Sequence, residues 1–221
     1  MKRTVGLLLI LALLCGGCSL MLQSGLTAGN SQRIESAHGF AFRVPLDWLM
    51  EEVDAEHVQY RFHSAEEDIY LTVVMELGGM AYDSTTEIGA ALAEQLAADL
   101  YDEVETERAE ETETSYRCLL RGMDADGAAL VSELYLYAPF VSARYYLLFQ
   151  ATDAVYDESR KMIDDVIASF ALTMTREEVY AHMREMREDA ANASAQEDAE
   201  TATDMESEAE GAGTGTEGGG Q

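Results

Sequence analysis

The sequence predicts an α+β fold, in which helices flank an antiparallel sheet of about six strands. Two observations lead to this prediction. Segments in which apolar and polar residues alternate, as in half-buried strands, lie on both sides of a segment with a helical repeat. The resulting order is strands, helix, strands, helix, which favours an antiparallel sheet with helices packed against it.

Three strands are expected before the first helix. Residues 39–44 alternate and stop at Pro45, which cannot continue a central ladder. The turn after Pro45 is expected to place Trp48, the only tryptophan, on the core. Residues 57–63 alternate strictly, and residues 69–75 form a more continuous apolar strand.

Two helices are expected in the domain. Ser84 and Glu87 form a capping box at the start of the first helix, at about residues 85–101. Its apolar stripe recurs every four residues, at Ile88, Leu92, Leu96 and Leu100. The second helix, at about residues 155–168, has its apolar side at Val155, Met162, Ile163, Val166 and Phe170.

After an acidic connection, three further strands are expected at residues 114–122, 128–138 and 141–151. Residues 124–127, Asp-Ala-Asp-Gly, are a tight-turn sequence between the first two. They also match part of a calcium-binding EF-hand loop, but Gly122 stands where the first aspartate should begin coordination. A hairpin turn explains the motif, so no metal site is predicted.

The N-terminus has the pattern of a bacterial export signal. Lys2 and Arg3 precede an apolar run at residues 5–14, which is too short for a spanning helix. Residues 15–18, Cys-Gly-Gly-Cys, resemble a lipobox, with Cys15 in place of the usual leucine. We therefore expect a lipoprotein signal peptide at residues 1–17 and lipid attachment at Cys18. The alternative is cleavage further on, for instance after Ala28, which would release a soluble protein.

The remaining boundaries follow from composition. Residues 18–33 are expected to be a flexible tether and residues 34–174 the folded domain. A polar helix is expected at residues 175–190, and its thin apolar stripe is a possible partner surface or packs back on its own domain: Val179, Met183 and Met186. Residues 191–221 carry acidic but no basic side chains and are expected to be disordered.

The charge and the cysteines limit the partners. The chain has 42 acidic and 14 basic side chains and a net charge of −28, which disfavours nucleic acid and anionic lipid surfaces as partners. If Cys15 is removed and Cys18 is acylated, Cys118 alone remains and no internal disulfide can form. Cys118 is expected to be a small buried hydrophobic residue.

Two segments resemble the PsbP-like superfamily, which includes the DcrB-type bacterial lipoproteins. Residues 39–48 read Gly-Phe-Ala-Phe-Arg-Val-Pro-Leu-Asp-Trp, and residues 145–150, Tyr-Tyr-Leu-Leu-Phe-Gln, precede a helix that closes on residues 167–170, Ile-Ala-Ser-Phe. The resemblance covers about residues 34–172. It implies a central antiparallel sheet flanked by helices and a mostly accessory or binding role, and it carries no catalytic residues.

No motif indicates catalysis or a cofactor. The sequence lacks a Gly-x-Ser-x-Gly elbow and the Gly-rich phosphate loops, and His57 and His63 are too far apart on one strand to share a metal. We therefore expect a membrane-anchored, non-catalytic accessory or binding module of the envelope, with a protein partner. The alternative is a carrier of a small apolar ligand or lipid, for which the Tyr-rich strands at 135–149 are the one indication. A hydrolase is less favoured.

Overall fold

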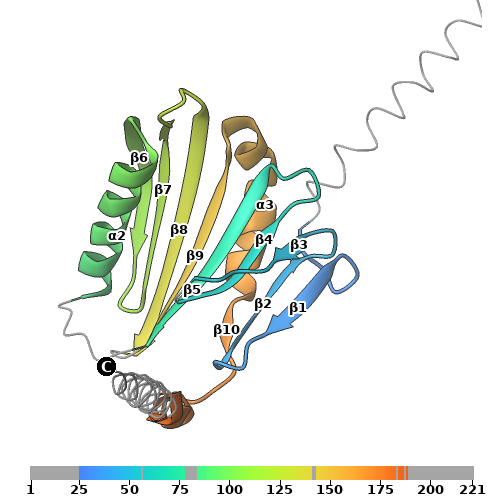
Figure 1. Ribbon diagram of the computed structural model, residues 1–221, viewed down its shortest axis with the longest axis vertical. Coiled ribbons are helices and arrows are strands. Elements are labelled where there is room, and N and C mark those ends of the chain that lie inside the picture. The colour runs from blue at the N-terminus through green and yellow to red at the C-terminus, as the bar shows by residue number, and fades with distance from the viewer. Residues whose placement is uncertain are drawn as a thin grey trace, which may run out of the picture. The chain divides into compact units, whose positions relative to one another are not determined.

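The computed structural model describes residues 25–55, 57–77, 84–140, 143–182, 184–186 and 188. The chain divides into two units, Met1–Arg176 and Glu177–Gln221, which are considered separately. The first unit contains two antiparallel sheets and two described helices (Figure 1). The predicted α+β class is therefore confirmed.

The larger sheet has seven antiparallel strands in the order β3-β4-β5-β9-β8-β7-β6. Their bounds, in this order, are Leu49–Glu51, Val58–His63, Ile69–Leu77, Ala143–Thr152, Ala129–Phe140, Ser115–Met123 and Glu103–Glu111. The smaller sheet has the order β1-β2-β10, with bounds Ser31–Glu35, Phe40–Pro45 and Ala171–Leu172.

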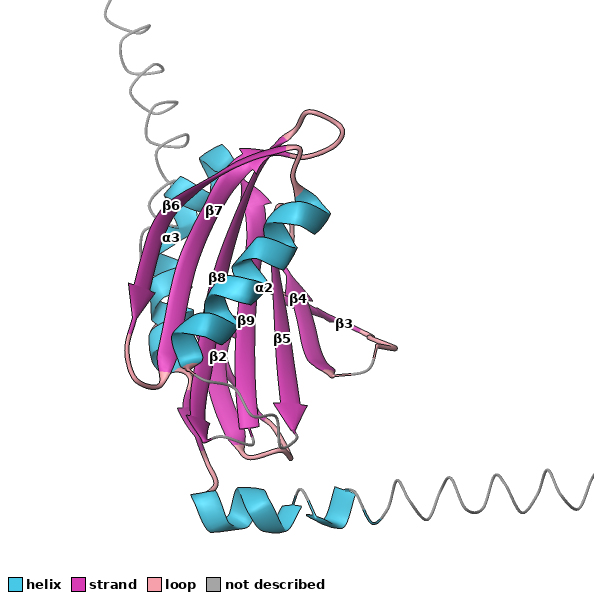
Figure 2. Cartoon of the chain, turned by 90° about the vertical axis from the view of Figure 1, so that its left-hand side faces the viewer, coloured by secondary structure: helices cyan, strands magenta, loops and turns pink. Residues whose placement is uncertain are grey.

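The helices α2 (Thr85–Leu100) and α3 (Asp153–Ser169) lie on opposite faces of the larger sheet (Figure 2). The predicted cap of α2 is present, because the hydroxyl of Ser84 accepts a hydrogen bond of 3.1 Å from the backbone N–H of Glu87. Helix α2 packs on β6, β7 and β8, whereas α3 packs on β8, β9 and β2.

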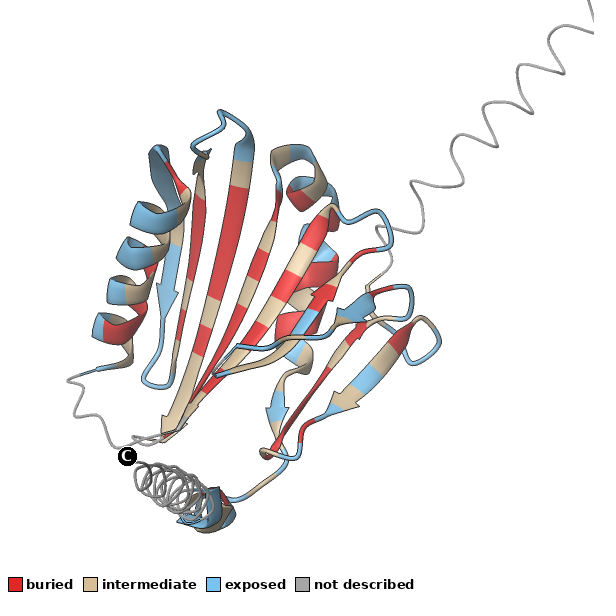
Figure 3. Cartoon of the chain, in the orientation of Figure 1, coloured by how far each residue is buried: buried red, intermediate tan, exposed pale blue. Residues whose placement is uncertain are grey.

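Each face of the sheet has its own apolar layer, and Figure 3 shows that buried residues gather on the central strands of the sheet. The layer under α2 includes Ile88, Ala93, Tyr101, Tyr116, Cys118, Leu120, Leu134, Leu136 and Tyr146. On the other face, neighbouring rings lie 5.5–6.2 Å apart and form a continuous aromatic cluster: Phe40, Phe42, Tyr60, Phe62, Tyr145 and Phe170. Trp48 is buried, as predicted.

Four strands differ from expectation, since no local pattern predicts β1, β3, β6 or β10. The most consequential is β6, where an acidic connection is expected instead. It is an edge strand with an almost wholly exposed surface, so it lacks the apolar alternation that identifies half-buried strands. Residues 31–33, expected in the tether, belong to β1, because they pair with residues 43–45 of β2.

Two further expectations need correction. Strand β2 is expected in the central sheet but lies in the smaller one. On α3, Val155 is only partly buried and the adjacent Tyr156 is buried instead. The physical reason is the hydroxyl of Tyr156, which has a buried hydrogen-bond partner on β8, so that an aromatic ring with a polar tip occupies the position.

In the second unit, residues 177–182, 184–186 and 188 are helical, in agreement with the predicted polar helix. The expected signal peptide and the expected disordered tail at residues 191–221 lie outside the described residues. None of the described helices combines the length and the apolar character that crossing a bilayer requires.

Candidate functional site

An acidic groove lies where the start of α3 meets the β6–β7 end of the larger sheet. Its volume is about 990 Å³. The apolar part of its lining comes from Val104, Gly122, Met123 and Ala129. The charged part comprises five acidic and two basic side chains: Glu103, Glu105, Glu107, Asp153, Asp157, Arg121 and Arg160.

Arg121 on β7 organises one wall of this groove. Its Nε lies 2.9 Å from Glu107 Oε2 and its Nη2 lies 2.9 Å from Asp157 Oδ1, while Nη1 forms an ion pair with Asp153. Burial by itself would lower the pKa of Arg121, but hydrogen bonds to Asp157 and Glu107 outweigh it and raise the pKa. Arg121 thus joins β6, β7 and α3 through charge-assisted contacts.

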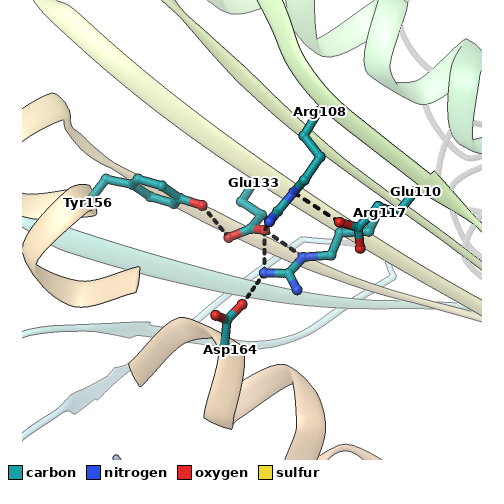
Figure 4. A network of polar contacts seen from close by, with 6 residues as sticks. All are labelled: Arg108, Glu110, Arg117, Glu133, Tyr156 and Asp164. Carbon is teal, nitrogen blue, oxygen red and sulfur yellow. Dashed lines mark hydrogen bonds and ion pairs between the residues drawn. The ribbon is translucent and has the colours of Figure 1, made fainter. Parts of the chain in front are cut away.

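A second, buried network lies between α3 and the same strands (Figure 4). At its centre is Glu133 of β8, whose side chain is 0% exposed. Tyr156 of α3 donates a hydrogen bond of 2.7 Å to Oε2. On Oε1, Arg108 Nη2 donates at 2.8 Å and Arg117 Nε at 2.6 Å. Arg117 also contacts Asp164 of α3 at 2.5 Å.

The two networks are adjacent, because the guanidinium of Arg121 lies 5.8 Å from the centre of the Tyr156 ring. Burial, followed by the hydrogen bond to Glu133, raises the pKa of Tyr156, which keeps the phenol a hydrogen-bond donor. Burial alone would lower the pKa of Arg117, but its contacts with Asp164 and Glu133 raise it. The interface between α3 and the sheet therefore carries fixed, mutually paired charges.

The position of Glu133 does not suit a general base. A general base must reach the proton that it removes, and Glu133 is buried with both carboxylate oxygens already accepting hydrogen bonds. Tyr156, Arg108 and Arg117 fix its position. The accessible part is the groove, where acidic side chains exceed basic ones. This excess of negative charge gives the groove the sign that attracts a cationic group.

The partial calcium-binding pattern has a structural explanation. The carboxylate of Asp124 accepts hydrogen bonds from the N–H groups of Asp126, at 3.0 Å, and Ala128, at 2.8 Å. Gly127 has a φ of 78°, which glycine adopts without strain. These residues form the β7–β8 hairpin turn, as predicted, while Glu133 belongs to the buried network. Among the described residues, no group of three or more His, Cys, Asp or Glu side chains could hold a metal ion.

Cys118 is fully buried under α2 as a free cysteine, which agrees with the expected hydrophobic role. Burial raises the pKa of its thiol to about 11, so the thiol is protonated and unreactive at neutral pH. His63 lies on β4 with its Nδ1 2.7 Å from the carbonyl oxygen of Ser64.

Among the described residues that line the groove, none is a predicted site residue. Cys18 and Met183 lie outside the described residues. Val179 is 3% exposed and Met186 is 38% exposed, and the partner surface that they were predicted to form with Met183 stays a prediction.

The charged residues of the two networks were not predicted from the sequence, although a signal is present there. Arg117 and Arg121 flank the apolar residues 118–120 on one strand, and Ser132 and Glu133 interrupt the apolar run at 130–134. A lone charge in a strand covered on both faces must find a partner of opposite sign. The identity of that partner depends on the register of three strands and the position of α3.

No family model and no curated protein matches this sequence. Solved structures do match. One is the solution structure of cyanobacterial PsbP (CyanoP) from Synechocystis, with a TM-score of 0.51 and 17% identity over 67% of this chain and 96% of that chain. Another is the Saccharomyces cerevisiae Ran-binding protein Mog1p, with a TM-score of 0.50 and 11% identity over 65% of this chain and 96% of that chain. A Mog1 E65A mutant gives a TM-score of 0.51 and 12% identity.

These matches cover nearly the whole of each solved domain, and their identities are low. They define the first unit as an α+β domain of PsbP-like fold, which confirms the fold implied by the sequence resemblance. The likeness is one of fold alone, and functions are carried by sites rather than by folds.

Proposed function

We propose that this chain is a non-catalytic binding module of the bacterial envelope, held to the membrane by lipid on Cys18. The observation that carries the binding role is the acidic groove between α3 and the β6–β7 edge. Arg121 orders one wall of the groove, because it pairs with three carboxylates from β6 and α3. Such preorganised charge favours recognition of a partner of opposite sign.

The fold supports a protein partner. One solved structure of this fold is described as a Ran-binding protein, and thus as a domain that binds another protein. The charge of −28 makes nucleic acid and anionic lipid poor partners. No specific observation favours the carrier alternative, since the rings around Tyr145 contact Phe40 and Phe170 at 5.5–5.6 Å and the groove is lined mainly by charges.

In-cell crosslinking tests the binding role. A photoreactive amino acid at position 129, an exposed alanine that lines the groove, is expected to capture one envelope protein from the intact lipoprotein. The matched control is the same amino acid at position 91, which is also an exposed alanine but lies on α2. Equal capture of bulk membrane proteins at both positions would contradict a specific binding module.

The anchor is tested by substitution. Cys18→Ala is expected to move the protein from the membrane fraction to the soluble fraction, because acyl chains on Cys18 supply the attachment and each buried methylene contributes about 0.8 kcal/mol. Cys118→Ala is the control, since that thiol is buried in the domain. Retention of the Cys18→Ala protein in membranes would refute the anchor.

A further inference from the structure

The outer side of β6 is an open sheet edge. In the sheet order β6 is terminal and pairs only with β7, and within the described part of the chain no other backbone group bonds to it. Eight of its nine residues are exposed. The opposite edge strand, β3, has only three residues. A long edge strand with unpaired N–H and C=O groups is a template for an added strand.

The charge of this edge determines which kind of segment can bind there. Five of the nine residues of β6 are glutamates. Glu103 and Glu105 lie opposite Met123 and Arg121 in the register and line the groove. Within the described residues, neither of them has an ion-pair partner, whereas Glu107 is held by Arg121. Two carboxylates therefore remain for an incoming cation.

A second copy of the chain is a poor occupant, because its own glutamates would stand opposite those of the first copy, and like charges facing each other across strands are destabilising. A basic segment would instead place positive charges opposite the glutamates, and this pairing is attractive. The groove also offers apolar contact, since Val104 is 37% exposed and Met123 is 41% exposed.

We propose that β6 binds an extended, basic segment of a protein partner, which adds to the larger sheet as a further strand. Lysine or arginine side chains of that segment lie over Glu103 and Glu105, and interspersed apolar side chains contact Val104 and Met123. The proposal rests on the proposed function and specifies the chemistry of the partner at the same groove. Backbone hydrogen bonds align the added strand with β6, and the charges make the binding specific for a basic segment.

Fluorescence anisotropy with a labelled peptide of repeated Lys-Val pairs tests this proposal on the detergent-solubilised full chain. The double variant Glu103→Lys/Glu105→Lys is expected to weaken binding by about tenfold or more, because two cross-strand charge pairs become repulsive. The control Glu94→Lys/Asp99→Lys makes the same charge change at exposed positions of α2 and is expected to change affinity by less than about twofold.

A second probe isolates the backbone contribution. The same peptide methylated on every backbone nitrogen keeps its charges and side chains but has no N–H donors, so it is expected not to bind. Equal weakening by both double variants, or equal binding of the methylated peptide, would overturn strand addition. So would a lack of binding to the unmodified protein. If the peptide fails while crosslinking from position 129 still captures one partner, strand addition is wrong and the binding module stands.

Discussion

At the scale of single residues, Glu133 is the most constrained charge in the domain. It is fully buried, and it accepts from Arg108, Arg117 and Tyr156 at 2.6–2.8 Å. A buried ion pair contributes little to stability compared with apolar residues in its place, but loss of one member removes a counter-charge from partners that stay charged inside the protein. Glu133 is therefore required for the folded state rather than for surface recognition.

We predict that Glu133→Gln lowers the free energy of unfolding by about 3–5 kcal/mol, because Arg108 and Arg117 lose their common counter-charge inside the protein. Denaturant titration monitored by circular dichroism measures it. The control is Glu110→Gln, which removes an exposed partner of Arg108 at 3.5 Å and is expected to cost less than about 1 kcal/mol. Similar values for the two variants would contradict the buried network.

Cys118 makes the stability of the domain depend on pH in the alkaline range. Burial raises the pKa of its thiol from 9.0 to about 11. The folded state thus favours the neutral thiol, and this contribution is fully present below pH 9 and lost as the pH rises towards 11. The fall is at most about 1.4 kcal/mol per pH unit. Across this window, we expect the free energy of unfolding to decrease more steeply in the unmodified protein than in Cys118→Ala. Parallel curves would contradict the assignment.

At the scale of elements, the close packing of α2 against the sheet depends on a glycine. Gly89 is buried in the helix, and a Cβ added there would lie 2.2 Å from ring atoms of Tyr116 on β7. Glycine is unfavourable inside a helix by about 1 kcal/mol relative to alanine, so its presence here reflects the close approach of helix and strand.

Gly89→Ala is therefore expected to destabilise the domain by about 1–3 kcal/mol, because overpacking outweighs the gain in helix propensity. Thermal and denaturant unfolding measure the change. Combining it with Tyr116→Leu, which removes the ring, is expected to restore part of the loss relative to Tyr116→Leu alone. An increase in stability for Gly89→Ala on its own would show that α2 does not pack this closely.

At the scale of the whole molecule, the main electrostatic feature is the large excess of negative charge. The chain has 42 acidic and 14 basic side chains, and such self-repulsion destabilises a compact state. Raising NaCl from about 20 mM to about 500 mM screens exposed charges, so we predict a higher melting temperature in high salt at pH 7. Near the sequence pI of about 4.2 this gain is expected to vanish. A lower melting temperature in high salt at pH 7 would show that attractive ion pairs outweigh the repulsion.

The sequence by itself determined the features that depend on neighbouring residues. Alternation predicted the main buried strands, Ser84 with Glu87 predicted the start of α2, and residues 124–127 predicted a hairpin turn. These features are local, because the spacing of apolar side chains along an element and the hydrogen bond of a helix cap each involve residues only a few positions apart. The excess of acidic residues likewise limits the classes of partner, because net charge depends on composition alone.

Only the tertiary structure decided the role of β6 and the composition of the groove. Residues 103–111 have no apolar alternation, and they form a strand because β7 pairs with them. Arg121 meets Asp153 and Asp157, which follow it by more than thirty positions in the chain. An edge strand is stabilised by its ladder, and a buried charge by its partner. Both depend on which distant segments the fold brings together, and this information does not reside in a local pattern.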